Sequence, residues 1–478
     1  MKSDFKVAYH EIDFLVPAQK FNIQFSYVSK KGLSFIREFL LRLIHVAPMS
    51  KLQLSTFFGL SRRETEEAIL DLVQRSELTL SADGLLTLTD KAKSYFHEIG
   101  EAPQLSIIQD SGAYLSFDMA TLTCFSSGNV KRAQKSGLFI KVDDKTLSQS
   151  QMLVERQFQY QFNQILDKGF LPNVKSQDIK DIPTVYTVKS VDKLQEFHIA
   201  LNAIFEMNSE GMAVERQDYD EFNNSEIVHE NISLTVSRML KANNSVSIFK
   251  SMVSLGDEDT IKLFDSGSNL IIPSYMQDLQ ALEWYGTSGR TTFLGPIYSK
   301  QNWDLLQKMM APILDSRIKG KKDQGSDRFI WLSPSDPFWG KSARFVSCLS
   351  DFLGRSKTKD KKIYNPTLYV PVAGFDDARG ARQWARELAD YKSNINGLVD
   401  GFLDGNVEFL YLENEIVVVI YHFSNPGILP VTMPLGFIST SKAVVNRIGA
   451  LVTGYVDGSS AFDKKNDCGN VELMSINR

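Results

Sequence analysis

Basic side chains gather at two places in the sequence where they could hold a polyanion. Residues 281–365 contain 15 Lys and Arg residues against 8 Asp and Glu residues, a net charge of +7. Because basic side chains bind backbone phosphates and aromatic rings stack on unpaired bases, this composition favours a nucleic-acid groove. Solvated loops around a tryptophan-containing core are the alternative. The basic residues are Arg317, Lys319, Lys321 and Lys322, then Arg355, Lys357, Lys359, Lys361 and Lys362, and the tryptophans are Trp284, Trp303, Trp331 and Trp339.

Known catalytic and cofactor motifs do not occur in the sequence. Residues 335–342 follow a predicted strand, as a phosphate-binding loop would, but Ser335 replaces the opening glycine and Pro337 removes a backbone amide. The six histidines never occur at metal-ligand spacing. We therefore expect no cofactor, no metal ion and no catalytic residue. A metal-dependent nuclease or phosphohydrolase site assembled from distant residues stays open as the alternative.

An acidic stretch lies between Glu206 and Glu230. It holds eight acidic residues and one basic residue, Arg216, a net charge of −7. Carboxylates of this kind can bind Mg²⁺, but the spacing matches no known calcium- or magnesium-binding loop. We interpret the stretch as a solvated loop.

The segment 34–96 has the clearest pattern of secondary structure. Apolar residues recur at helical spacing over 34–47, and two capping boxes, Ser50-x-x-Gln53 and Ser61-x-x-Glu64, start a second helix and a third that runs to about residue 76. Strands over 77–80 and 85–88 flank Asp83-Gly84, a dipeptide that favours a hairpin turn. Another helix begins at Lys91. The predicted order is therefore helix, helix, helix, hairpin, helix.

This order, together with Leu88-Thr89-Asp90-Lys91-Ala92 after the hairpin, resembles the winged helix-turn-helix family. In that family the third helix enters the major groove and the wing contacts the backbone. The resemblance implies DNA contacts at Ser61, Arg62, Arg63 and Thr65, with Lys91 and Lys93 beyond the wing. However, residues 1–100 carry a net charge of only +1, whereas DNA-reading domains normally present a basic face. Docking on a protein is the alternative role of this domain.

The remaining chain alternates between strand and helix patterns. Short strands are predicted at 105–108, 113–117 and 138–142, followed by a helix at 149–167. In the C-terminal part, the predicted strands are 329–332, 367–372, 407–412, 416–423 and 435–439, and the helices are 341–353, 378–403 and 442–455. Alternation of this kind predicts a three-layer α/β domain with a mixed sheet.

The last three strands and the final helix of this domain look like one half of a phospholipase D-type hydrolase. That family carries His-x-Lys on a strand and a Gly-Ser-x-Asn turn after the next one. The corresponding segments here end in Tyr421-His422 and in Ile438-Ser439-Thr440-Ser441, and neither motif is present. The resemblance therefore implies a degenerate, phospholipase D-like α/β domain that keeps the fold and lacks the catalytic residues.

Length and composition set the general frame. The chain has 478 residues, 43% of them hydrophobic, and a net charge of −4, which excludes a mainly disordered or collagen-like chain. We expect an α+β multidomain protein with a winged helix at 1–100, a mixed α+β segment at 101–275 and an α/β domain at 276–478. The three cysteines lie far apart, and the N-terminus lacks a secretory signal pattern, so a cytoplasmic protein without membrane contact is expected.

These observations predict a non-enzymatic protein that binds DNA, duplex or single-stranded. It could act as a regulator or as a subunit of a DNA-targeting or phage-defence complex with protein partners. A metal-dependent nuclease and a protein-docking adaptor are the alternatives.

Overall fold

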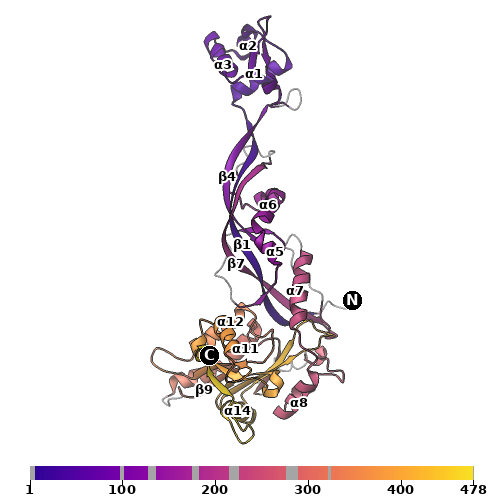
Figure 1. Ribbon diagram of the computed structural model, residues 1–478, viewed down its shortest axis with the longest axis vertical. Coiled ribbons are helices and arrows are strands. Elements are labelled where there is room, and N and C mark those ends of the chain that lie inside the picture. Colours follow the sequence, from indigo (N-terminus) through magenta and orange to yellow (C-terminus); the bar gives the residue numbers. More distant parts are fainter. Residues whose placement is uncertain are drawn as a thin grey trace. The chain divides into compact units, whose positions relative to one another are not determined.

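The computed structural model describes residues 6–96, 102–126, 136–174, 182–214, 225–275, 289–320 and 325–476 (Figure 1). The chain divides into two compact units. Both contain helices, and their strands form several sheets, so the predicted α+β class is confirmed. Unit 1 comprises Met1–Pro17, Val130–Val142 and His198–Arg478, and unit 2 comprises Ala18–Asn129 and Asp143–Phe197.

These units do not follow the sequence-based divisions at residues 100 and 275. Two long strands, β1 (Lys6–Gly32) and β7 (Thr184–Asn208), contribute residues to both units. The start of β1 is joined to distant residues of unit 1 by hydrogen bonds. The amide of Asp13 donates to the carbonyl of Lys341 (2.8 Å), and the Asp13 carboxylate accepts from the amide of Ala343 (2.7 Å). Local sequence patterns carry no information on such pairings.

In unit 2, residues 34–96 form a helical module with the predicted order of elements. Both capping boxes are present, and Gly59 and Gly84 adopt the positive φ that ends the second helix and closes the hairpin. The apolar residues that set the helical spacing, such as Leu40, Ile44 and Leu72, fill the core of the module. Its elements are α1 (Phe35–Val46), α2 (Lys51–Phe58), α3 (Arg62–Gln74), β2 (Leu78–Leu80), β3 (Leu86–Leu88) and α4 (Asp90–Lys93).

The rest of unit 2 contains long strands where shorter ones were expected. β4 (Gln104–Asp118) pairs antiparallel with β1 along its whole length, so the two predicted strands at 105–108 and 113–117 are one. The polar residues between the two predicted strands fit into the sheet. The Ser26 hydroxyl donates to Asp110 (2.6 Å), and Gly112 leaves room for the side chain of Gln24 on the neighbouring strand. α6 (Ser150–Asp167) packs its aromatic residues against β1.

Unit 1 is built around a mixed sheet of eight strands. Its order is β15-β11-β10-β9-β12-β13-β14-β8, in which only β9, β10 and β11 run parallel. The central strands β12 and β13 are buried along their full length, in agreement with their apolar sequences. The bounds are β8 (Arg290–Leu294), β9 (Arg328–Leu332), β10 (Asn365–Val372), β11 (Ile395–Val399), β12 (Val407–Leu412), β13 (Ile416–Phe423), β14 (Met433–Ser439) and β15 (Asp467–Asn470).

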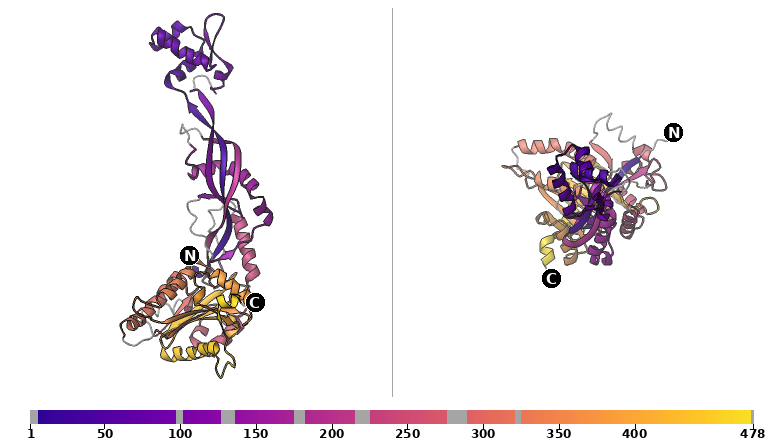
Figure 2. Two further views of the ribbon diagram at one scale, coloured as in Figure 1. Left: turned by 60° about the vertical axis from the view of Figure 1, so that its left-hand side comes forward. Right: turned by 90° about the horizontal axis from the view of Figure 1, so that it is seen from above.

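Helices cover both faces of this sheet. Figures 1 and 2 show α11 and α12 on one face and α14 on the other. A large hydrophobic core lies on the α11 side and includes Trp331, Trp339 and Phe345. Other segments of unit 1 are β6 (Leu138–Phe139), which pairs with β1, and α7 (Ser225–Met239), α8 (Ser245–Leu255) and α9 (Glu258–Ile261). The remaining helices are α11 (Lys300–Lys319), α12 (Ala343–Gly354), α13 (Ala378–Glu387), α14 (Lys442–Asp457) and α15 (Val471–Ile476).

One predicted helix is wrong. Residues 378–403 were expected to form a single helix, but α13 ends at Glu387 and Ile395–Val399 is strand β11 of the sheet. A short apolar run fits a buried strand as well as a helix, so spacing alone could not separate the two. Gly397 marks the difference, because a side chain there would collide with Met474 and Val372 on the neighbouring elements.

Candidate nucleic-acid interface

The residues predicted to contact DNA on α3 are largely committed to local partners. Thr65 is buried and donates to the carbonyl of Ser61 (3.0 Å), so its side chain is not available for the predicted DNA contact. The Ser61 hydroxyl is part of the capping box. Arg62 and Arg63 are exposed, but each pairs one turn along with a glutamate, at 3.3 Å to Glu66 and 3.1 Å to Glu67. The positive charges of α3 are therefore neutralised on their own helix.

The two lysines beyond the hairpin also have local partners. The Nζ of Lys91 donates to the carbonyl of Arg75 (2.8 Å), and Lys93 pairs with Asp90 (3.1 Å). Both lysines are exposed. The exposed pair of Lys93 with Asp90 contributes about 0–1 kcal/mol and can exchange for a phosphate. Lys91 keeps its positive charge, because the backbone carbonyl that it contacts is neutral.

The two basic clusters near the C-terminal side of α11 lie next to each other. The Nζ of Lys361 donates to the carbonyls of Arg317 (2.5 Å) and Gly320 (2.6 Å), which fixes the segment 355–362 beside the end of α11. Arg355 pairs with Asp351 (2.6 Å) and Lys362 donates to an asparagine. Exposed lysines of this cluster are Lys319, Lys357, Lys359 and Lys362, and Lys321 and Lys322 lie outside the described residues.

Arg317 does not belong to that surface. Its side chain is 2% exposed and lies 3.0 Å from Asp327 and 3.6 Å from Glu415, and it donates to the carbonyl of Ile363 (3.1 Å). A guanidinium that is enclosed by two carboxylates cannot reach a phosphate. The prediction that Arg317 contacts nucleic acid is therefore wrong.

The predicted pairing of basic residues with tryptophans also fails. Trp303, Trp331 and Trp339 are buried in the core of unit 1, and Trp284 lies outside the described residues. The three described indoles stack on one another or on phenylalanines in the interior. They hold the sheet and its helices together and cannot stack on bases.

A second arginine-rich helix, on which the sequence predicted no binding residue, presents a different surface. On α13, Arg379, Arg382 and Arg386 recur at spacings of three and four residues and are all exposed, while Ala381 is buried and Trp384 donates to the carbonyl of Pro371 (3.0 Å). Within the described part of the chain, no ion pair joins any of these three guanidinium groups to a carboxylate.

The sequence around α13 explains why Arg379 and Arg382 have no acidic partner one turn later. Position 383, one turn after Arg379, is a glutamine, and position 386, one turn after Arg382, is another arginine. The N-cap Asp377 lies near Arg379, but its oxygens accept from the amides of Ala373 (3.0 Å) and Gly380 (2.8 Å), and these backbone bonds hold its pKa below the ordinary range. Two like charges one turn apart, such as Arg382 and Arg386, destabilise a helix by about 0.2–0.5 kcal/mol. The positive charge of this face therefore lowers the stability of α13 slightly.

These arginines line a groove of about 1070 Å³ in unit 1. Lys341, which pairs with Glu387, also lines it, as do Phe139 of β6 and His198 of β7. The wall thus combines four basic side chains with one acidic side chain and an exposed aromatic ring. No local pattern could have joined these segments. The sequence shows no acid four residues after Arg379 or Arg382, but it places Asp390 four residues after Arg386, and only the structure shows that α13 ends before Asp390.

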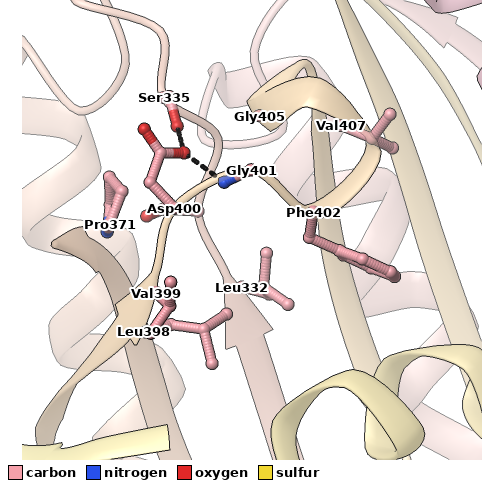
Figure 3. Close-up of a pocket in the computed structure, with 11 residues that line it drawn as sticks. Leu332, Ser335, Pro371, Leu398, Val399, Asp400, Gly401, Phe402, Gly405 and Val407 are labelled. Carbon is pink, nitrogen blue, oxygen red and sulfur yellow. Dashed lines mark hydrogen bonds between the residues drawn. The ribbon is translucent and has the colours of Figure 1, made fainter. Parts of the chain in front are cut away.

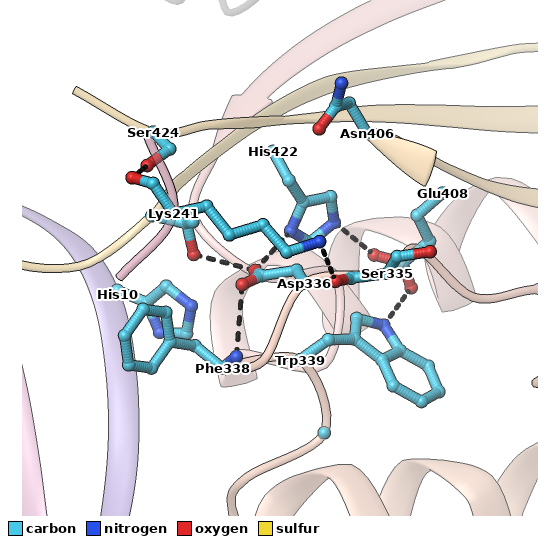
Figure 4. Close-up of polar contacts among 12 residues, drawn as sticks. His10, Lys241, Ser335, Asp336, Phe338, Trp339, Asn406, Glu408, His422 and Ser424 are labelled. Atoms are coloured by element: carbon cyan, nitrogen blue, oxygen red, sulfur yellow. Dashed lines mark hydrogen bonds and ion pairs between the residues drawn. The ribbon is translucent and has the colours of Figure 1, made fainter. Parts of the chain in front are cut away.

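A buried polar cluster lies inside the same unit (Figure 4). Nδ1 of His422 is 2.9 Å from Asp336 and Nε2 is 3.0 Å from Glu408, and all three side chains are at most 2% exposed. Glu408 also accepts from the indole nitrogens of Trp331 (2.7 Å) and Trp339 (2.9 Å). Each member of the cluster is therefore satisfied by the protein itself.

The electrostatics of this cluster indicate a structural role. Burial disfavours the charged form of His422, but hydrogen bonds with Asp336 and Glu408 outweigh burial and raise its pKa to about 9. Burial lowers the pKa of the nearby His10 to about 4. At neutral pH His422 is an imidazolium with both nitrogens engaged, so it has no lone pair for nucleophilic attack.

The segment that imitates a phosphate-binding loop has its amides occupied. The amide of Ser335 donates to the carbonyl of Gly405 (2.8 Å), that of Phe338 to Asp336 (3.1 Å) and that of Gly340 to the hydroxyl of Tyr298 (3.0 Å). The adjacent recess at the ends of β9, β10 and β11, in which the Ser335 hydroxyl donates to Asp400, holds only about 10 Å³ (Figure 3). That is room for about one water molecule and not for a phosphate.

The acidic stretch gives no metal site in the described part. Glu206 lies in β7 and Glu226 and Glu230 lie in α7, whereas 215–224 are outside the described residues. Among the described side chains, no group of three or more His, Cys, Asp or Glu residues could hold a metal ion. None of the described helices combines the length and apolar character needed to cross a bilayer.

No family model matches the sequence, and no curated protein matches it either.

Proposed function

We propose that the protein is a non-enzymatic nucleic-acid-binding protein whose main contact surface is the groove beside α13. The observation that carries this proposal is the row formed by Arg379, Arg382 and Arg386, which faces the groove without acidic partners among the described residues. Guanidinium groups bind phosphate through paired hydrogen bonds and stay charged at all physiological pH values. The exposed lysines at the end of α11 would add sequence-independent contacts.

The proposal is tested with the full-length chain and fluorescently labelled DNA. Reversing two charges in the row, Arg382→Glu with Arg386→Glu, should weaken binding roughly 100-fold, because attraction to phosphates becomes repulsion. The matched control, Arg62→Glu with Arg63→Glu, changes the same number of charges on α3 and should weaken binding only about 3-fold. Equal losses in the two variants would place the contact surface elsewhere.

The helical module supports a second role, docking on a protein. Phe35 of α1 is 75% exposed, and Leu52 and Phe57 of α2 are 77% and 66% exposed. Large apolar side chains in such number on a small module favour a protein interface. We propose that this module attaches the nucleic-acid-binding unit to a partner within a multi-subunit complex, such as one that targets foreign DNA.

Photo-crosslinking tests this second role. A crosslinking residue at position 57 should yield one dominant protein adduct in the native cell, and the purified partner should lose binding to the Phe35→Ser, Phe57→Ser variant. A crosslinking residue at position 375 serves as the control, because Phe375 of unit 1 is also an exposed phenylalanine (58%). Adducts of identical composition from both positions would contradict the docking role.

The order of elements supports a proposal about the family of each of two parts of the chain. We propose that residues 34–96 are a winged helix used mainly for docking. We also propose that the sheet of unit 1 is a phospholipase D-like domain that has lost its His-x-Lys motif, so that a cytoplasmic DNA-binding role replaces hydrolysis. A metal-dependent nuclease remains the competing function, and DNA cleavage by the purified protein in Mg²⁺ or Mn²⁺ would establish it.

A further inference from the structure

We propose that the groove beside α13 holds an unpaired strand of nucleic acid, with phosphates on the arginines and a base against Phe139. This inference rests on the proposed function and names its ligand. The groove is slightly larger than the roughly 300–1,000 Å³ that small-molecule pockets occupy, which suits a segment of polymer.

Phe139 is presented to the groove by strand alternation. β6 pairs in parallel with β1, Phe14 opposite Leu138 and Leu15 opposite Phe139. Because successive side chains of a strand point to opposite faces, Leu138 is buried while Phe139 is 58% exposed. An exposed apolar ring beside basic residues is what a stacked base requires.

A second ring supports the first. His198 of β7 also lines the groove and meets Phe139 edge to face, with ring centroids 5.0 Å apart and planes at 83°. The contact limits rotation of the Phe139 side chain, so less conformational entropy is lost when a base stacks on it.

The arginine row gives the strand its path. Arg379 and Arg386 are seven residues apart on one face, about 10 Å along the helix axis, so the row can contact two or three successive phosphates. Lys341, which pairs with Glu387, lies over the ring of Trp384 with Nζ 5.8 Å from the ring centroid, and it adds a further amine donor to the same wall.

Phe139 should make binding depend on whether the bases of the nucleic acid are paired. In a duplex the bases are stacked inside and only phosphates reach a basic groove, whereas an unpaired base can turn outward onto an aromatic ring. Arginines alone would hold both forms, so the preference for a single strand depends on Phe139.

The experiment uses the full chain with a fluorescein-labelled 20-nucleotide oligo(dT) and the same strand paired with oligo(dA). Wild type should bind the single strand at least 10-fold more tightly than the duplex. Phe139→Ala should weaken single-strand binding roughly 5- to 100-fold and duplex binding less than 2-fold, and Phe139→Trp should restore it. Phe375→Ala is the control, because Phe375 is also 58% exposed but does not line the groove.

The outcomes separate this inference from the proposed function. If the Phe139→Ala variant loses single-strand and duplex binding equally, or loses neither, the unpaired-strand assignment is overturned, although the arginine variants still decide the proposed function. If polyglutamate competes as well as oligo(dT), the groove is a general polyanion site and the assignment is likewise overturned. If 2-aminopurine placed in the oligonucleotide is quenched by wild type and not by Phe139→Ala, stacking at this ring is supported.

Discussion

Two helices of this protein carry arginines on an exposed face, and they differ in what stands one turn away. On α3, Arg62 and Arg63 are followed four residues later by Glu66 and Glu67, and both pairs form. On α13, the residue four positions after Arg379 is Gln383. The difference shows that the net charge of a helix face depends on acids at helical spacing as well as on the number of arginines.

The supporting structures also differ. α3 rests on the small core of its own module, whereas Trp384 of α13 packs against Trp339, with ring centroids 6.2 Å apart. Trp339 in turn donates to Glu408 of the buried cluster. The arginine row is therefore anchored, through two tryptophans, to the charged interior of unit 1.

The largest expected effect comes from breaking that anchor. His422→Ala leaves Asp336 and Glu408 buried without their cation and should lower the free energy of unfolding of unit 1 by about 3–5 kcal/mol. Hydrogen exchange should show lost protection in α13 and unchanged protection in α3. Thr432→Val, which removes only one hydrogen bond to Asp336, should cost about 1 kcal/mol. Equal loss of protection in both helices would show that they share one cooperative unit.

The pH dependence of stability is the next effect. The pKa of His422 is raised from 6.5 to about 9, so its stabilising contribution is complete below pH 6.5 and is lost as the pH rises through 9. The pKa of His10 is lowered from 6.5 to about 4, so its contribution is present above pH 6.5 and is lost as the pH falls toward 4.

Together these two groups predict that the stability of unit 1 peaks near pH 6.5. Urea unfolding between pH 5 and pH 9.5 should show this peak, and the His10→Phe variant should lose the acid side of it. A flat profile across that range would contradict the assigned charge states.

A smaller effect should follow when α13, like α3, carries an acidic residue four positions after an arginine. Gln383→Glu places a carboxylate one turn after Arg379 and should weaken nucleic-acid binding about 3- to 10-fold, because the new pair competes with phosphate. Gln383→Met, which keeps the side-chain length without charge, should bind as the wild type does. Anisotropy titration at low salt measures both, and identical affinities in the two variants would break the comparison.

The converse change should have the smallest effect. Glu66→Gln with Glu67→Gln frees the two arginines of α3, and the affinity for DNA should rise about 2- to 3-fold in the same titration. A rise of 100-fold would instead make α3 the main contact surface.

The sequence predicted the local elements better than their arrangement. Caps and turns such as Ser61, Gly59 and Asp83-Gly84 act over four or five residues, so the helical module was predicted in order. The end of α13 was missed because Ile395–Val399 fits both a strand and a helix. The burial of Arg317 was missed because its partners Asp327 and Glu415 come together only in the folded sheet.

The residues of the candidate groove were likewise only partly predictable from the sequence. The arginines of α13 were present in the sequence, with no acid four residues after Arg379 or Arg382. Asp390, four residues after Arg386, lay inside the predicted helix, and only the structure shows that α13 ends before it. The contributions of Phe139 and His198 were not predictable, because β6 and β7 reach this wall from segments more than 180 residues earlier in the chain.

The central claim is that the arginines of α13 hold phosphates, and the salt dependence of binding tests it most directly. Each phosphate contact on a single strand adds about 0.7 to the slope of log affinity against log salt concentration. The Arg379→Gln, Arg382→Gln, Arg386→Gln variant should therefore lose about 2 units of slope for oligo(dT) between 50 and 200 mM salt. An unchanged slope would contradict the claim.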